Sequence, residues 1–184
     1  MLAAGFIKAS KEYQAKGFKD FAVSAIGVCV DNFSMAKSNI VHSKRPRRQN
    51  PVLDFRYRIK KIDFWLATVL FNSKKVKPVR SRWFSTPGQI DIMEGYGGVL
   101  VRPEFFKPDD LYIPDPIWRV DDIWLSGLLA KRKIPVLANY YSRIPQAHDE
   151  TIYALAEEIT NGLSRQDLNQ LAIKHFQKNY GVWL

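Results

Sequence analysis

Hydrophobic residues recur along the chain with two different periods, and these predict both helices and strands. Residues 2–16 carry apolar side chains at helical intervals and are followed by Gly17, a residue that suits a helix C-terminus. The stretch "FAVSAIGVCV" (21–30) is short, continuous and apolar, which indicates a buried strand. The same reasoning predicts a helical or mixed stretch at 53–71, a strand-loop-strand at 89–102, a helix from Asp122 to Lys133, a strand at 134–139, and helices at about 150–160 and 164–179.

This order of elements predicts an α/β fold with a mixed sheet and C-terminal helices. Ser164, with Asp167 three residues later, is typical of a capping box. Pro103 suits the first position of a short helical turn. Residues 31–51 contain two prolines and a basic cluster, so we expect an irregular segment there. We interpret 1–184 as one domain, with a basic irregular or helical insertion at 31–82, a candidate catalytic core at 89–137 and C-terminal helices at 150–184.

The composition excludes several classes of protein. Of the 184 residues, 46% are hydrophobic and 25% are charged, which is typical of a soluble globular chain. The apolar stretch 62–71 is about half as long as a membrane span requires, so we expect no transmembrane segment. Cys29 is the only cysteine, which precludes an intrachain disulfide and fits a reducing compartment. "MLAAGFIKAS" lacks the charged start of a signal peptide. We therefore expect a cytoplasmic location, with peripheral association at a membrane left open.

The positive charge of the chain is concentrated in one segment. The formal net charge is +10, and residues 44–82 hold 13 of the 28 Lys and Arg but only two of the 18 Asp and Glu. A localised basic segment favours an anionic partner such as a phosphate, a nucleic acid or a membrane surface. A solvated loop with a charged helix face is the alternative interpretation, and the composition does not separate the two.

A glycine-rich motif follows the strand predicted near residue 90. In "DIMEGYGGVLVRPEFF" (91–106), Glu94 precedes Gly95, Tyr96, Gly97 and Gly98. Glycines after a strand let a ligand approach the backbone closely. The motif lacks the Gly-Lys-Ser/Thr of a phosphate-binding loop and the spacing of a dinucleotide fingerprint. By itself it favours a tight turn over a binding site.

A second motif places two adjacent aspartates at the start of an apolar helix. In "VDDIWLSGLLAKRKIPV" (120–136), Asp121 and Asp122 precede the apolar positions. One carboxylate is enough to cap the free N–H groups of a helix start, and a second adds like-charge repulsion. We therefore expect one aspartate to cap the helix and the other to have a chemical role. The alternative is that both only cap the helix.

Together, "EGYGGVLVRPEFF" and "DDIWLSGLLAKRKIPV" resemble the acceptor half of glycosyltransferases with the GT-A fold, especially bacterial and viral family 2-like enzymes. The resemblance runs from about residue 20 to the end of the chain, and it is strongest over 90–137. It implies a partial GT-A domain. The N-terminal nucleotide-binding half of that family, with its D-x-D motif, is not found here and would be expected before residue 1.

The resemblance implies a role for particular residues. Asp122 would be the general base of an inverting transfer, with Asp121 as its neighbour or as the helix cap. The donor and acceptor would be bound by Glu94, Gly95, Tyr96, Gly97, Gly98 and Trp124. The family also implies a divalent cation, Mn²⁺ or Mg²⁺, for which His148 is a candidate ligand. Arg80 and Arg82 are candidate contacts for the diphosphate because they precede the glycine motif in the sequence.

The partners implied are a nucleotide-sugar donor, a carbohydrate or lipid-linked acceptor, and a second chain that supplies the donor half. Two other functions remain open at this stage. One is a non-catalytic glycosyltransferase-like domain that binds carbohydrate or a partner chain. The other is a basic nucleic-acid-binding module, based on "KRPRR", "FRYRIKK" and "KKVKPVRSR" (within 44–82) with their interleaved aromatic residues.

Overall fold

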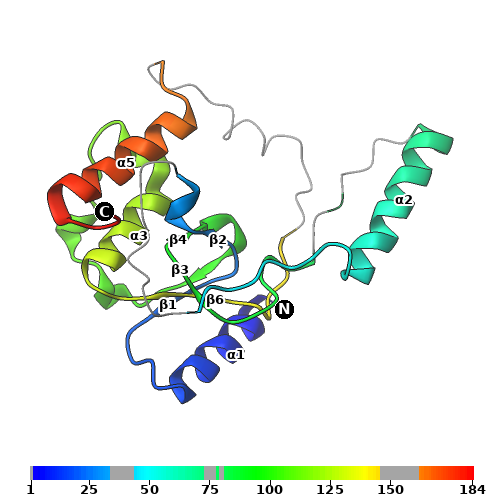
Figure 1. The fold of residues 1–184 in the computed structure, drawn as a ribbon, viewed down its shortest axis with the longest axis horizontal. Helices are drawn as coiled ribbons and strands as arrows, with labels where there is room; N and C mark the ends of the chain where they lie inside the picture. The colour runs from blue at the N-terminus through cyan, green and yellow to red at the C-terminus, as the bar shows by residue number, and fades with distance from the viewer. Residues whose placement is uncertain (1, 34–43, 73–77, 79–80, 146–161) are drawn as a thin grey trace.

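The computed structural model describes residues 2–33, 44–72, 78, 81–145 and 162–184. It is a mixed α/β fold built on a four-stranded sheet with the strand order β3-β6-β1-β5 (Figure 1). The strands are β1 (Ala22–Ser24), β3 (Gln89–Ile90), β5 (Val99–Leu100) and β6 (Val136–Ala138). The central strands β1 and β6 run parallel, whereas β5 and β3 pair antiparallel at the two edges. The prediction of an α/β fold with a mixed sheet is confirmed.

Helices cover the two faces of this sheet. On one face, helix α1 (Leu2–Ala15) packs against Val23 of β1 and Leu137 of β6 through Phe6, Ala9 and Tyr13. On the other face, Leu129 of helix α3 (Asp121–Lys131) packs against Ala22, Val136 and Ala138. Adjacent residues of one strand thus contact opposite layers, as the alternation of side chains along a strand requires. Figure 1 shows α1 and α3 on opposite sides of the strands.

Helix α5 (Arg165–Tyr180) forms a further layer against α3. Its N-terminus has the predicted capping box, in which the Ser164 hydroxyl accepts a hydrogen bond from the Asp167 N–H and the Asp167 carboxylate accepts one from the Ser164 N–H. Its C-terminal end turns at Gly181, whose φ of 63° is left-handed. This turn returns Trp183 to the core against Phe176. The helix predicted at 164–179 is therefore confirmed, whereas the one at about 150–160 lies outside the described residues.

The prediction of a single strand over 21–30 is only partly right. The segment divides into β1 and a second strand, β2 (Gly27–Val28), which pairs antiparallel with β4 (Ile92–Met93) in a separate two-stranded sheet. The division has a local cause, because the Ser24 hydroxyl donates to the Ile26 carbonyl at 2.6 Å and bends the chain there. Local hydrophobicity does not reveal such a bend.

Several shorter elements connect this framework. The strand-loop-strand predicted at 89–102 is confirmed in part: the first strand divides into β3 and β4, which belong to different sheets, and the helical turn η2 (Gly95–Gly97) lies between β4 and β5. The turn predicted at Pro103 is η3 (Pro103–Phe105). The other single turns are η1 (Val30–Asn32), η4 (Pro108–Leu111) and η5 (Ile117–Val120).

Helix α2 (Phe55–Phe71) extends away from the layered body, as Figure 1 shows. Asp54 anchors its N-terminal end by accepting hydrogen bonds from the Tyr57 N–H at 3.1 Å and from the Ser81 N–H at 2.7 Å. Ala67 is the one buried residue within the helix. The predicted helical character of 53–71 is confirmed, but the helix does not join the core.

Candidate functional site

The two sequence motifs meet at the N-terminal end of α3. The Gly95 N–H donates a hydrogen bond to Oδ1 of Asp122 at 3.0 Å, although 27 residues separate them in the chain. Glu94 precedes this glycine at the end of β4 and is half-buried, as is Asp122. We refer to Glu94 and Asp122 as the acidic pair. The structure therefore brings together the two residues that carry the sequence motifs.

The acidic pair is held by a buried hydrogen-bond relay beneath it. The Ser126 hydroxyl donates to the Asp122 carbonyl at 2.6 Å and accepts from the Met93 N–H at 3.0 Å. Ser126 is fully buried, and its bond to Met93 is buried as well. The two bonds fix the first turn of α3 against β4 and set the position of Asp122 relative to Glu94.

The glycines of η2 allow this close approach. A β-carbon at Gly97 would lie 2.3 Å from Cγ1 of Ile26, which is closer than atoms can pack. Gly98 has a φ of 88°, a left-handed conformation that favours glycine. A β-carbon at Gly95 would lie 3.1 Å from Oδ1 of Asp122. The glycines thus serve the fold of the loop as well as the contact with the carboxylate.

The environment raises the pKa of both members of the acidic pair. For Glu94 the main cause is burial, followed by repulsion from the Asp122 carboxylate. For Asp122 the pKa is raised mainly by burial and further by the neighbouring Asp121, while the Gly95 hydrogen bond works in the opposite direction. Raised carboxyl pKa values are suited to proton transfer near neutral pH.

Two arginines that the sequence did not reveal complete the site. The positive charges of Arg48 and Arg165 attract Glu94, and Arg165 also attracts Asp122. The Arg48 guanidinium lies 4.7 Å from the centre of the Trp83 ring and lines a cavity of about 300 Å³ with Gly27 and Phe84. Arg48 comes from the basic segment and Arg165 from the start of α5, so only the folded chain brings their charges toward the acidic pair.

Neither aspartate caps α3 in the way the sequence predicts. The N-cap residue is Val120, and no side chain makes the capping hydrogen bond. Asp121 and Asp122 both lie inside the first helical turn, where their charges favour the positive end of the helix dipole. Asp121 is exposed, whereas Asp122 bonds to the glycine loop. The expectation that one aspartate caps the helix is therefore wrong.

The structure places Trp124 in the core rather than on a binding surface. The residue is 5% exposed, and its ring packs against the rings of His175 and Phe176 of α5. The indole N–H donates to the Asp110 carbonyl at 2.7 Å. A ring enclosed in this way has no face for a sugar, so we leave Trp124 out of the candidate site. Tyr96, in contrast, is half-exposed on η2, where its hydroxyl donates to the Pro145 carbonyl at 3.0 Å.

The remaining candidates do not enlarge the site. The Arg82 side chain is exposed and donates to the Tyr140 carbonyl at 3.2 Å. Arg80 and His148 lie outside the described residues. Within the described part of the chain, no group of three His, Cys, Asp or Glu side chains is arranged to hold a metal ion. The described residues therefore do not fit the divalent cation that the sequence resemblance implies.

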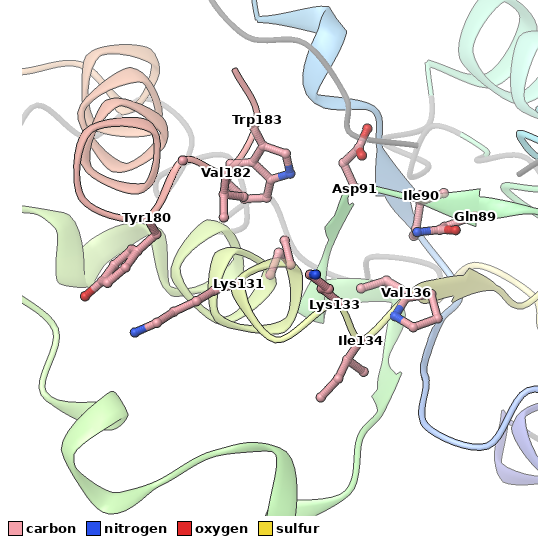
Figure 2. Close-up of a pocket in the computed structure, with 14 residues that line it drawn as sticks. Gln89, Ile90, Asp91, Lys131, Lys133, Ile134, Val136, Tyr180, Val182 and Trp183 are labelled. Carbon is pink, nitrogen blue, oxygen red and sulfur yellow. The ribbon is translucent and has the colours of Figure 1, made fainter. Parts of the chain in front are cut away.

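A larger cavity of about 420 Å³ lies elsewhere, at the C-terminal half of α3 (Figure 2). Its lining includes Lys131, Lys133, Trp183 and the buried carboxylate of Asp91, but neither member of the acidic pair. Asp91 accepts hydrogen bonds from the Val30 N–H at 2.9 Å and from Arg45 at 3.4 Å, which gives it a structural role. The acidic pair therefore does not line this cavity, although Ser126, whose hydroxyl bonds the Asp122 carbonyl, does.

Comparison of the chain with models of protein families, with curated proteins and with solved structures found no match in any of the three. No helix in the described part of the chain is long and apolar enough to cross a membrane.

Proposed function

We propose that this chain carries the acceptor side of an inverting glycosyl transfer, with Asp122 as the general base. The observation that carries the proposal is the hydrogen bond from the Gly95 N–H to Oδ1 of Asp122 at 3.0 Å. It joins the two motifs that resemble family 2-like glycosyltransferases, and it does so at a half-buried carboxylate whose pKa is raised. A carboxylate oriented by a backbone N–H is suited to accept a proton from a bound hydroxyl.

The proposed step transfers a sugar from a nucleotide diphosphate to an acceptor hydroxyl. Oδ2 of Asp122 accepts the hydroxyl proton while the acceptor oxygen forms its bond to the anomeric carbon. The bond from that carbon to the diphosphate oxygen breaks, and the nucleoside diphosphate leaves with the electron pair. Attack from the face opposite the leaving group inverts the anomeric configuration.

Other residues would position the reactants. Glu94 carries the second half-buried carboxylate beside the proposed base and is suited to accept a hydrogen bond from a sugar hydroxyl. The positive charges of Arg48 and Arg165, which already act on this site, would favour the charge that develops on the leaving diphosphate.

The test compares two adjacent aspartates. Release of nucleoside diphosphate is measured for the wild type, Asp122→Asn and Asp121→Asn, using a panel of sugar nucleotides, candidate carbohydrate and lipid-linked acceptors, and Mn²⁺ or Mg²⁺. Loss of a general base lowers kcat by about 10² to 10⁴-fold, so we expect that loss for Asp122→Asn. We expect Asp121→Asn, which alters an exposed carboxylate, to change kcat by no more than about threefold.

Other outcomes would favour the alternative functions. Calorimetry could show that the wild type and Asp122→Asn bind a sugar nucleotide with equal affinity while neither turns it over. That result would favour a non-catalytic carbohydrate-binding domain. Oligonucleotide binding with a steep salt dependence, together with no sugar-nucleotide binding, would favour a nucleic-acid-binding module. Equal kcat values for the two aspartate variants would contradict the role of Asp122.

A further inference from the structure

Helix α2 presents a continuous apolar surface to solvent. At 100° per residue, its first, fifth, eighth, twelfth, fifteenth and sixteenth residues fall on one side of the helix. These residues form what we call the α2 stripe, and each is between 38% and 72% exposed: Phe55, Ile59, Ile62, Leu66, Val69 and Leu70. Trp65 extends the stripe on one side and is 57% exposed. Contiguous exposed apolar side chains of this kind mark an interaction surface.

Basic side chains border the stripe on both sides. Arg58 and Lys61 lie on the side of Trp65, and Arg56 and Lys60 lie on the other, together with the acidic Asp63. Across residues 44–72, eight Lys and Arg stand against two Asp. The helix therefore combines an apolar centre with positive edges, and its surroundings in the sequence have the same sign of charge.

The α2 surface also contains a concavity in which apolar and basic groups meet. This concavity has a volume of about 540 Å³, and its apolar lining includes Val52, Ile62 and Trp65. Arg58 and Lys61 line the same space. Such a lining matches a molecule that is anionic at one end and apolar at the other.

We propose that α2 is an interfacial helix that docks this protein on membranes containing anionic lipids. The stripe would enter the boundary between head groups and acyl chains, and the basic side chains on its two edges would meet lipid phosphates on either side. With 17 residues, four of them basic, the helix would lie in the membrane plane rather than cross it. The Asp54 carboxylate caps the helix and also accepts a hydrogen bond from the Ser81 N–H, which ties the start of α2 to a distant segment of the chain.

The arrangement of charge decides between a membrane and other partners. A nucleic acid would satisfy the basic residues but would leave six apolar side chains of the stripe in water. A second copy of the chain would cover the stripe but would bring two positively charged helices together. A planar anionic surface satisfies both features at once. This inference concerns a surface that excludes the acidic pair, and it does not rest on the proposed glycosyl transfer.

The test measures co-sedimentation of the full chain with vesicles of phosphatidylcholine alone or with about one third phosphatidylglycerol. Each Lys or Arg near an anionic surface contributes about a fivefold gain in affinity, so we expect at least tenfold tighter binding to the anionic vesicles. The double variant Ile62→Gln with Val69→Gln should weaken that binding about tenfold or more. The matched control Thr68→Gln, on the polar side of the same helix, should bind within about threefold of the wild type.

A second pair of substitutions tests the charges. Replacing both Arg58 and Lys61 by Gln should lower affinity for anionic vesicles by about tenfold or more and leave binding to phosphatidylcholine unchanged. All of the substituted positions are exposed, and the buried Asp54 and Ala67 are kept, so the unfolding midpoints should match the wild type.

Four results would overturn the proposal. The first is no binding to anionic vesicles, and the second is equal binding by the wild type and the Ile62/Val69 double variant. The third is binding to a random-sequence oligonucleotide that exceeds binding to the vesicles and is unaffected by the double variant. The fourth is a dimer in light scattering that the double variant converts to a monomer, without vesicle binding by either form.

Discussion

The backbone N–H of Gly95 and the Oδ1 atom of Asp122 lie 3.0 Å apart, joined by a hydrogen bond that closes the glycine loop over the start of α3. The bond fixes the rotation of a half-buried carboxylate. It also orients one oxygen toward the loop, and under the proposed function the other oxygen would accept the proton of the acceptor hydroxyl. The relationship predicts measurable effects at both residues and at their neighbours.

A methyl group at Gly95 would disturb the carboxylate more than the fold. In Gly95→Ala the new β-carbon would meet Oδ1 of Asp122 at 3.1 Å, so the carboxylate would have to rotate or shift by a few tenths of an ångström. Misplacement of a catalytic group lowers kcat strongly. We expect about a tenfold loss of kcat, a KM for the nucleotide-sugar within about twofold of the wild type, and an unchanged thermal unfolding midpoint. A lower midpoint with proportionate loss of activity would indicate a general folding defect instead.

The proposed glycosyl transfer should depend on pH through Asp122. A general base must be deprotonated, so kcat/KM should fall as the pH drops through the raised pKa of Asp122. Because Asp121 contributes to that raised pKa, Asp121→Asn should move the falling limb of the profile to lower pH. The measurement is kcat/KM against pH for both proteins. A limb at the same pH in both would contradict the electrostatic coupling of the two aspartates.

Glu94 should reduce stability at neutral pH. Its folded-state pKa is raised above the ordinary value of 4.5. At pH values between the unfolded-state and the folded-state pKa, the carboxyl group is therefore protonated in the folded state and ionised in the unfolded state. The free energy of unfolding therefore falls as pH rises through this interval. Glu94→Gln removes the effect and should stabilise the protein at pH 7 by about 0.5 kcal/mol, a small value because solvent screens a half-buried group.

Urea denaturation at pH 7 and near pH 4 tests the Glu94 prediction. Near pH 4 the carboxyl group is mostly protonated in both states, so the difference between the wild type and Glu94→Gln should become smaller. A stabilisation that is equal at the two pH values would show that the charge of Glu94 is not its cause.

The contact between α3 and α5 depends on a glycine. A β-carbon at Gly127 would lie between 2.4 and 2.5 Å from three ring atoms of Phe176, and Phe176 is fully buried. Overpacking of this kind costs about 1 to 3 kcal/mol, which exceeds the gain in helix propensity of roughly 1 kcal/mol from alanine. We expect Gly127→Ala to be destabilised by about 1 kcal/mol in denaturant unfolding.

The exposed residue Lys174 of α5 supplies the control for Gly127. Lys174→Ala should change the free energy of unfolding by no more than about 0.5 kcal/mol. A Gly127→Ala protein as stable as this control would mean that Phe176 repacks without cost.

Most helices and one strand of this protein follow from local patterns in the sequence. Hydrophobic periodicity and polar end residues located α1, α2, α3, β6 and α5, because helix and strand formation depends largely on neighbours within a few residues. The Ser164–Asp167 capping box is one such local signal. The glycine loop and the acidic start of α3 were also found as separate motifs, and their resemblance to one enzyme family predicted that they act together.

Tertiary packing decided the rest. It placed the two halves of the apolar run at 21–30 in two different sheets, because their strand partners β6 and β4 come from distant parts of the chain. It enclosed Trp124 against α5 and turned Asp122 toward Gly95 rather than toward a capping bond. It also placed Arg48 and Arg165 where their positive charges oppose the rise in the pKa of Glu94. It left the α2 stripe exposed to solvent. Charges and apolar side chains far apart in the chain acquire their environment only when the elements pack, which is why residue patterns alone did not place them.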